Sequence, residues 1–238
     1  MPADISEFPT QAVSRPVMFQ AWRGLTFLHW PYQPESIRHL LPENVELDTF
    51  DGAAWIGLTP FLLAGLRPPF LPAIPWISCF PEMNVRTYVR TSDGQRGIWF
   101  FSLEADRLAA VAGARLTYGL PYRWAAMRIR FHVARVEYSS RRHSGPGRAH
   151  IIIRRQSRIE ASARERFLTA RFRLYTRIAG RLAFAPVDHE PWPLETATLE
   201  HLEQDVIQNS NLPSPSGEPL VHFSPGVSVR VGRPMLAK

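Results

Sequence analysis

The sequence predicts an α+β protein built mainly from an antiparallel, curved, barrel- or cone-like β-sheet with a few peripheral helices. Candidate strands outnumber candidate helices along the 238 residues. The strands follow one another through turn signals, as hairpins do, and do not alternate with helices as βαβ units require. A chain of this length buries roughly 70–75% of its unfolded surface. We expect a polar, mobile leader at residues 1–16 and a single domain at residues 17–238.

The first half of the chain carries the clearest strand and turn patterns. Its strands are runs of aromatic and β-branched residues, and Asp51-Gly52 is a typical hairpin turn between two of them. The predicted elements are a strand at Gln20–Trp30, a short helix at Pro34–Leu41, strands at Val45–Phe50 and Ala53–Phe61, a stiff proline-rich loop at 66–81, and a hairpin of Met83–Thr91 with Gly97–Ala105.

The second half mixes helices with longer strands. Gly119 and Pro121 end an alanine- and leucine-rich helix, and Ser162 with Glu165 forms a capping-box signature. The predicted elements are a helix at Arg107–Tyr118, long strands at Tyr122–Tyr138 and Arg148–Ile159, a short helix to Leu168, one or two strands to Phe184, a helix at Glu195–Val206 and a last strand at Leu220–Val231.

The chain is basic, with a formal net charge of +7, and every one of its 28 Lys and Arg residues except Lys238 is arginine. Two interpretations of this bias stay open. Guanidinium forks suit phosphate or nucleic-acid binding, but a composition bias also places arginine on protein surfaces. The arginines form only short clusters and no basic tail, so a nucleic-acid partner is the less favoured interpretation.

Several classes of site find no support in the sequence. The single cysteine, Cys79, excludes an internal disulfide and fits a reducing, cytoplasmic location. The eight histidines lack metal-ligand spacing, and phosphate-loop, zinc-protease and nucleophilic-serine motifs are absent, so we expect neither metal nor cofactor. The longest apolar stretch, Leu58–Leu66, is about half of a membrane span. We therefore expect no membrane partner, and the N-terminus does not resemble a signal peptide.

The segment Phe80–Arg90 separates polar from apolar side chains with the period of a strand. One face is apolar, and the other carries Glu82, Asn84, Arg86 and Tyr88. The polar face either meets solvent, which parity alone slightly favours, or lines a cavity in which Glu82 and Arg86 neutralise each other. His189, in the segment DHEPWPL, is interpreted as part of a structural corner with a buried Trp192.

Five blocks in order resemble the YqjF-like family of bacterial proteins, and this family resembles a branch of the acetoacetate-decarboxylase-like superfamily. The blocks are LDTFDGAAWIGLTPF, FPEMNVRTYV, GIWFFSLEAD, GLPY and HEPWPL, and the closing VHFSPGVSVRV extends the match. Together the five blocks cover about residues 20–195. The resemblance implies a conical antiparallel sheet with an internal pocket.

The resemblance to the decarboxylases also implies site residues. Arg23 matches a strand arginine by its distance from Leu41-Pro42-Glu43, and Glu82 matches the pocket glutamate. The Gly-Arg-Glu helix element of the decarboxylases corresponds to Gly113-Ala114-Arg115, in which the arginine is displaced by one position. Arg115 is therefore a further candidate ligand-binding residue.

The Schiff-base lysine of the decarboxylases has no counterpart. Their Tyr-Pro-Lys-Lys segment becomes Leu120-Pro121-Tyr122-Arg123, and the only lysine of the chain is Lys238. Neither a phenol nor a guanidinium replaces an amine that condenses with a ketone. The resemblance thus implies the fold and the pocket, and it excludes the parent reaction.

Two hypotheses follow. In the first, a cavity binds a small carbonyl or carboxylate ligand, either as a non-covalent lyase, hydratase or enolising isomerase or without turnover. Its acid–base groups are Glu82 and Tyr122, and its ligand-binding residues are Arg23, Asn84, Arg86 and Arg115. In the second, a basic surface binds nucleic acid or another partner without catalysis. The sequence leaves the ligand and homo-oligomerisation open.

Overall fold

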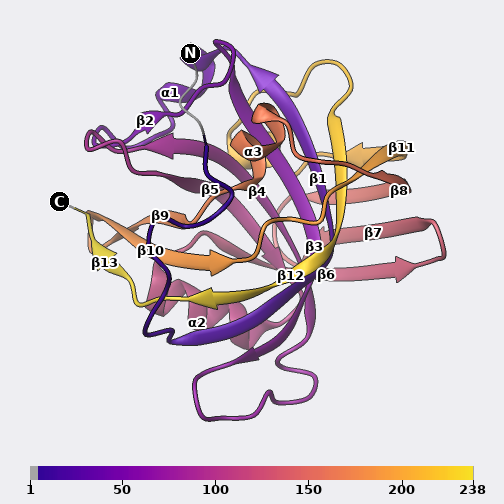
Figure 1. Ribbon diagram of the computed structural model, residues 1–238. Helices are drawn as coiled ribbons and strands as arrows, with labels where there is room; N and C mark the ends of the chain where they lie inside the picture. The colour runs from indigo at the N-terminus through magenta and orange to yellow at the C-terminus, as the bar shows by residue number, and fades with distance from the viewer. Residues whose placement is uncertain (1–4, 238) are drawn as a thin grey trace.

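The computed structural model describes residues 5–237, and one large sheet that closes on itself dominates it (Figure 1). The strand order is β13-β10-β9-β5-β6-β7-β8-β11-β12-β1-β3-β4-β2. The strands are β1 (Met18–Tyr32), β2 (Glu46–Leu47), β3 (Ala54–Arg67), β4 (Phe80–Arg90), β5 (Arg96–Ala105), β6 (Tyr122–Phe131), β7 (Arg135–Arg142), β8 (Arg148–Arg158), β9 (Arg173–Ile178), β10 (Arg181–His189), β11 (Glu195–Gln204), β12 (Leu220–Val231) and β13 (Met235–Leu236).

Short helices decorate the sheet. They are α1 (Pro34–Arg38), α2 (Leu108–Tyr118), α3 (Ala163–Thr169) and a 3-10 turn, η1 (Gln208–Ser210). The pairings of the described strands are antiparallel except for β5–β6 and β5–β9. The predicted α+β, mainly antiparallel and barrel-like fold class is therefore confirmed.

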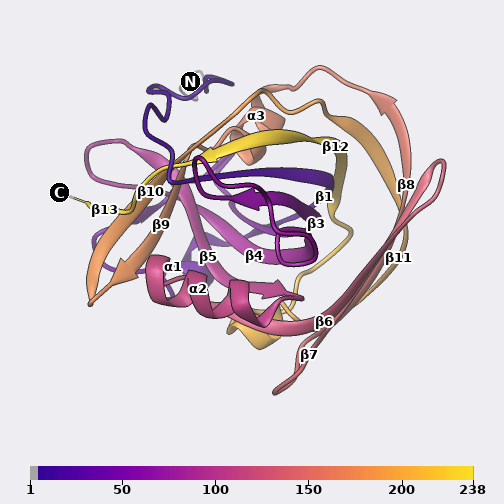
Figure 2. The same cartoon turned by 90° about the horizontal axis from the view of Figure 1, so that it is seen from below.

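Two extra pairings close the sheet into two rings that share a wall. The β4–β5 pairing closes a ring of β5, β6, β7, β8, β11, β12, β1, β3 and β4. The shared wall consists of β12, β1, β3, β4 and β5. The β10–β12 pairing closes a smaller ring, in which β9 and β10 connect the two edges of this wall. Figure 2 shows the wall in the middle, with β9 and β10 on one side and β7, β8 and β11 on the other.

Each ring has its own core, because alternate side chains of the wall point to opposite sides. Leu58 and Val85 of the wall pack with Ile151 of β8 in the larger ring. Leu103 of the wall packs with Val187 of β10 in the smaller ring. A wall that is buried on both faces explains why every residue of β4 except Pro81 and Arg90 is buried.

Most predicted elements of the first half, and the first helix of the second half, are confirmed. The hairpin of β4 and β5, the long loop between β3 and β4, and α2 with its left-handed C-cap Gly119 (φ 63°) form as expected. The Asp51-Gly52 turn also forms, with positive φ at both residues. The strand predicted before this turn, however, is only the short β2, and it pairs with β4. The turn therefore does not join two long strands that pair with each other.

Two predictions in the second half are wrong. Residues 195–204, predicted as a helix, form strand β11, which pairs with β8 and β12. The single strand predicted over Tyr122–Tyr138 is a hairpin of β6 and β7, with a turn at residues 132–134. That turn contains no glycine, proline, asparagine or aspartate, so the sequence pattern does not reveal it.

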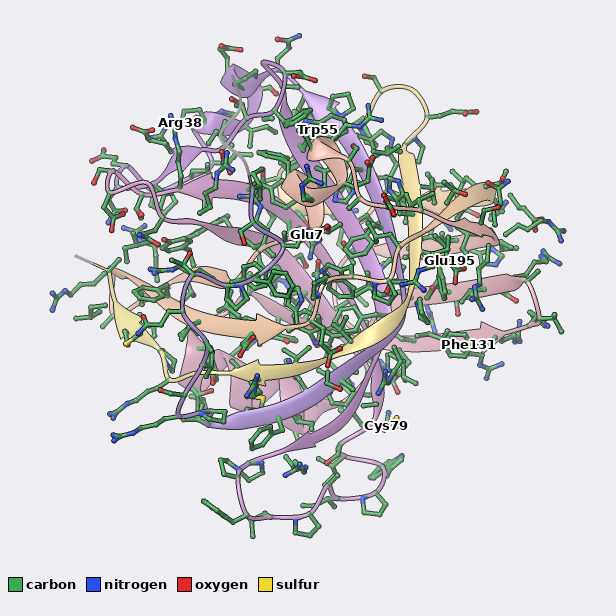
Figure 3. All side chains as sticks on the ribbon, viewed as in Figure 1. Glu7, Arg38, Trp55, Cys79, Phe131 and Glu195 are labelled. Carbon is green, nitrogen blue, oxygen red and sulfur yellow. The ribbon has the colours of Figure 1, made fainter. Side chains whose placement is uncertain are left out.

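The ends of the chain and the β3–β4 loop complete the fold. Residues 1–4 of the predicted mobile leader lie outside the described residues, whereas Val13 is buried and its amide donates to Asp188 (3.4 Å). The β3–β4 loop protrudes from the sheet and carries the exposed Cys79 (Figure 3). Among the described residues, no helix is both long and apolar enough to cross a membrane.

Candidate functional site

A cavity of about 80 Å³ lies inside the smaller ring, between the shared wall and strands β9 and β10. This volume holds several water molecules or a small organic acid. Apolar side chains of β1, β3, β5 and β10 supply most of its lining, and its polar side chains include Glu82, Asn84, Arg86, Tyr122, Arg171 and His189. A buried hollow with a few convergent polar groups is typical of a ligand site.

Strand β4 supplies three of these polar side chains because it separates the two ring interiors. Met83 and Val85 point into the larger ring. Glu82, Asn84 and Arg86 alternate with them and line the cavity, each only 4–6% exposed. The solvent-facing interpretation of this polar face, slightly favoured by parity, is therefore wrong.

Glu82 and Tyr122 form the hydrogen-bonded centre of the cavity. The Tyr122 hydroxyl donates to Glu82 Oε2 at 3.0 Å. Burial raises the pKa of Glu82 to about 8, the bond from Tyr122 lowers it, and the nearby Glu104 carboxylate raises it further. Burial and the Glu82 carboxylate hold the pKa of Tyr122 well above its usual value. At neutral pH, Glu82 is therefore mostly a neutral carboxylic acid beside a neutral phenol.

Arg86 is a buried cation without a carboxylate partner among the described residues. Its Nη2 donates a long bond of 3.5 Å to the Leu168 carbonyl, and its Nε has no hydrogen-bond partner. The ion pair between Glu82 and Arg86 that the sequence suggested does not form, because Glu82 bonds to Tyr122 instead. Asn84 likewise buries an unpartnered Oδ1. Unpaired buried polar atoms are costly and need an explanation.

The Arg86 guanidinium lies against aromatic rings that are themselves held in place. It lies 5.4 Å from the Phe27 ring centre and 5.8 Å from that of Tyr88. The Tyr88 hydroxyl donates to the Leu168 carbonyl at 2.7 Å, so it accepts from His29 Nε2 at 2.6 Å. Burial and the charge of Arg86 keep the pKa of His29 well below its usual value, which leaves this imidazole neutral.

Two predicted ligand-binding residues lie outside the cavity. Arg23 is exposed on the outer side of β1, because the next residue, Gly24 (φ 53°), sits in a bulge that turns Trp22 and Leu25 to the cavity side. Arg115 is also exposed, and its Nε donates to the backbone carbonyl of Tyr122 at 2.8 Å. Spacing in a sequence does not resolve such one-residue shifts, which change the face of a side chain. Arg115 supports the strand that carries Tyr122.

Comparisons with known proteins agree with this architecture. Residues 19–228 match the DUF2071 family model, which is described as an uncharacterized conserved protein. The chain belongs to the DUF2071 family. It is 39% identical over 212 residues to the uncharacterized protein YqjF of Bacillus subtilis (strain 168), and the match covers 87% of each chain.

Solved structures share the fold of this DUF2071 protein at much lower identity. The enduracididine biosynthesis enzyme MppR with bound HEPES superposes with a TM-score of 0.69 at 11% identity, over 96% of this chain and 91% of that one. Acetoacetate decarboxylase from Legionella pneumophila superposes with a TM-score of 0.65 at 15% identity, over 100% and 92%. These likenesses concern the fold, and they confirm the acetoacetate-decarboxylase-like architecture that the sequence resemblance implied.

Three cavity residues of the DUF2071 chain were not predicted as site residues. His189, at the end of β10, is buried, and burial lowers its pKa. Trp192 stacks on Trp22 with ring centres 5.9 Å apart and closes the same side of the cavity. Arg171 lies in the cavity wall between α3 and β9. The HEPWPL block contains His189 and Trp192 and was the sequence feature that could have indicated them as site residues. No local sequence pattern indicates Arg171.

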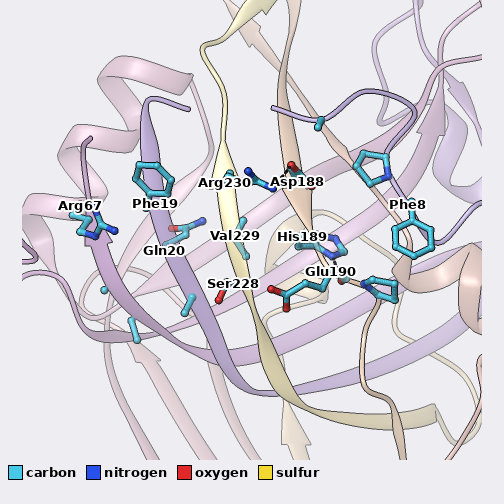
Figure 4. Close-up of a pocket in the computed structure, with 16 residues that line it drawn as sticks. Phe8, Phe19, Gln20, Arg67, Asp188, His189, Glu190, Ser228, Val229 and Arg230 are labelled. Atoms are coloured by element: carbon cyan, nitrogen blue, oxygen red, sulfur yellow. Dashed lines mark hydrogen bonds and ion pairs between the residues drawn. The ribbon is translucent and has the colours of Figure 1, made fainter. Parts of the chain in front are cut away.

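A larger hollow of about 760 Å³ lies on the outside of the same ring (Figure 4). Its floor is a row of small side chains on neighbouring strands, Ala64, Ala21 and Ser228. Arg230 in this groove is already paired with Asp188 at 3.0 Å. The groove is the more open of the two hollows, and it shares Gln20 and His189 with the cavity. The cavity, which holds the unpaired Arg86, is therefore the better candidate site.

The cavity offers donors, a buried positive charge and one titratable acid. Tyr122 lines the cavity and no lysine is among its described lining residues, and the groups present are suited to hydrogen bonding, charge stabilisation and proton transfer. Within residues 5–237, no cluster of three His, Cys, Asp or Glu side chains is arranged to hold a metal ion.

Proposed function

We propose that the cavity binds a small 2-oxo acid or a related carbonyl-carboxylate ligand, and that Glu82 with Tyr122 performs non-covalent acid–base chemistry on it. One observation carries the proposal: the Arg86 guanidinium is 6% exposed, has no carboxylate within ion-pair distance among the described residues, and lines the cavity. A buried unpaired cation is strongly unfavourable. A ligand carboxylate supplies the missing charge and two acceptor oxygens.

Glu82 and Tyr122 are suited to the carbonyl end of such a ligand. With its pKa near 8, Glu82 changes protonation close to neutral pH, as an efficient acid–base group does. As a carboxylate it takes a proton from the carbon next to the carbonyl: the C–H bond breaks, an O–H bond forms on Glu82, and the electron pair moves toward the carbonyl oxygen. The Tyr122 phenol stays protonated and remains a donor.

Ligands bound to proteins of similar fold also support this ligand class. Solved structures of MppR include complexes with pyruvate and with the condensation product of pyruvate and imidazole 4-carboxaldehyde. These proteins are 11–12% identical to this chain, so they support the choice of probe and not the identity of the ligand.

Calorimetric titration with pyruvate and 2-oxobutyrate tests the binding step. We expect wild-type protein to bind, and Arg86→Met to bind about ten- to hundredfold more weakly, because a charge-assisted hydrogen bond contributes about 1.5–3 kcal/mol. Arg90→Met is the matched control, since Arg90 is exposed at the end of the same strand. Equal affinities of wild type and Arg86→Met would remove the basis of the proposal.

Proton exchange tests the acid–base step separately from binding. In D₂O, wild-type protein should exchange the methyl protons of pyruvate, with a rate that rises as the pH passes about 8, because Glu82 acts as the base. Glu82→Gln should bind pyruvate and exchange at the rate of buffer, followed by proton NMR. Binding without exchange in wild type would make the protein a binding protein without this chemistry.

A further inference from the structure

A second buried guanidinium lines the same cavity. Arg171 is 3% exposed, and its Nη1 donates to Asp48 Oδ2 at 2.5 Å. Its Nη2 is buried without a hydrogen-bond partner. Arg171 therefore resembles Arg86 in offering an unused donor inside the smaller ring.

The end of α3 holds both guanidinium groups. Arg171 Nε donates to the Phe167 carbonyl at 2.8 Å, and Arg86 Nη2 approaches the next carbonyl, that of Leu168, at 3.5 Å. Carbonyls in the last turn of a helix lack helical partners and carry partial negative charge. The two guanidinium carbons also lie near one ring, that of Tyr88, at 5.8 Å for Arg86 and 4.8 Å for Arg171.

The charges around this cluster do not balance. Asp48 accepts from Arg171 Nη1 and also from Arg96 Nη2 at 3.0 Å, whereas Arg86 and Arg173, which also line the cavity, have no carboxylate partner among the described residues. Glu82 adds no negative charge at neutral pH, because burial keeps it protonated. Burial also lowers the pKa of His189, so this histidine adds no positive charge. The guanidinium groups at the cavity therefore outnumber the charged carboxylates beside them.

We propose that the ligand carries two carboxylates, one held by Arg86 and the other by the unused side of Arg171. This inference rests on the proposed function, since it assigns a class of ligand to the same cavity. A single carboxylate gives an acceptor to one of these two guanidinium groups, whereas a dicarboxylate gives an acceptor to each. Four-carbon acids such as succinate, and oxo acids of that size, belong to this class.

The test compares acids of equal carbon number. Calorimetric titrations at constant ionic strength pair succinate with butyrate and malonate with propionate. We expect each dicarboxylate to bind at least about tenfold more tightly than its monocarboxylate, as a charge-assisted bond implies. Arg171→Gln should abolish that difference and leave monocarboxylate affinity within about threefold. Arg90→Gln, at an exposed ion pair, should leave all four affinities unchanged.

Circular dichroism would show whether Arg171→Gln is folded. If it is not, a second variant tests the same inference. Asp48→Asn removes the competing carboxylate, so it should strengthen dicarboxylate binding severalfold over wild type. Equal affinities for mono- and dicarboxylates in wild type would refute this inference and leave the proposed function standing. Failure of every acid, including pyruvate, would refute both.

Discussion

At the residue scale, the polar groups of the cavity lower the stability of this DUF2071 protein when no ligand is bound. Arg86 and Asn84 bury atoms without partners, and Glu82 is held in its neutral form. Groups that reduce stability and face an enclosed hollow are what a binding site requires, because the ligand supplies the missing partners.

Removing the charge of Arg86 should therefore stabilise the ligand-free protein. We expect Arg86→Met to raise the free energy of unfolding by about 1–2 kcal/mol, because the methionine stem keeps the packing against Phe27 while the unpaired charge disappears. Urea unfolding without ligand measures this change. Arg90→Met should stay within about 0.5 kcal/mol. A large loss of stability in Arg86→Met would mean that Arg86 is structural.

Glu82 should give the protein a pH-dependent stability. Its pKa is about 8 when folded and near 4.5 when unfolded, so between these values the folded state keeps a proton that the unfolded state has lost. The stabilisation is complete below pH 4.5 and is lost as the pH rises through 8, with a slope of at most about 1.4 kcal/mol per pH unit.

Glu82→Gln should remove that part of the slope. The measured quantity is the difference in unfolding free energy between wild type and variant at several pH values. Glu203→Gln, at an exposed ion pair with Arg148, should show no such trend. A constant difference for Glu82→Gln from pH 5 to 9 would contradict the raised pKa.

At the scale of elements, α3 is short, yet it orders the cavity. Its capping box is complete: the Ser162 side chain accepts from the Arg164 amide, and Glu165 accepts from the Ser162 amide at 3.0 Å. Its far end presents the Phe167 and Leu168 carbonyls to Arg171, Arg86 and Tyr88. Helix and cavity are therefore energetically linked.

Loss of the cap should affect both stability and binding. We expect Ser162→Ala to destabilise the fold by about 1 kcal/mol and to weaken binding of the acids tested above. Thermal unfolding and calorimetry on the same variant measure the two effects. Ser92→Ala, in an exposed turn, is the control. Destabilisation with unchanged affinity would show that α3 does not position the guanidinium groups.

The elements also show where prediction from sequence succeeds. Hairpins with turn residues, the capping box and the helix that ends at Gly119 were predicted because their signals are local. Residues 195–204 were assigned to a helix, because their strand partners lie 26 or more residues away. Glu195 meets Arg155 and Glu200 meets Arg154 only in the folded sheet. Tertiary context overrides local propensity in such segments.

The candidate site was predicted in part for the same reason. Alternation in β4 gathered Glu82, Asn84 and Arg86 on one face, and the sequence resemblance implied that Glu82 and Tyr122 lie in one pocket, where they form a hydrogen bond. Arg23 was misplaced because the bulge at Gly24 is not visible from spacing. Arg171 and His189 reach the cavity through the β5–β9 and β10–β12 pairings, which no local pattern specifies.

At the scale of the whole molecule, some of the arginines are paired with carboxylates on the surface. Arg135, Arg154, Arg155 and Arg148 pair with glutamates of β11. The buried guanidinium groups of the smaller ring differ, because they outnumber their carboxylate partners. The cavity is therefore where buried positive charge without a carboxylate partner is available to a ligand.

Ligand binding in this molecule should be non-covalent. Borohydride treatment in the presence of pyruvate should leave no reduced adduct on any cavity residue, because the only lysine of the chain is Lys238 and a phenol forms no Schiff base. Mass spectrometry of the digested protein measures this, with an authentic Schiff-base decarboxylase as the positive control. An adduct mapped to the cavity would contradict the proposed chemistry.

The two-sided wall has an evolutionary consequence. Substitutions at the even-numbered positions of β4, from 82 to 86, change what the cavity recognises, while the odd-numbered positions keep the larger ring packed. A scaffold of this kind can exchange one polar side chain of the cavity for another without rebuilding its main core. Inserting or deleting one residue in the same strand is different. It would turn the charged side chains toward the apolar core of the larger ring and the aliphatic side chains toward the cavity. Lineages that carry this fold should therefore diversify by point changes in the wall and accept length changes only in the loops.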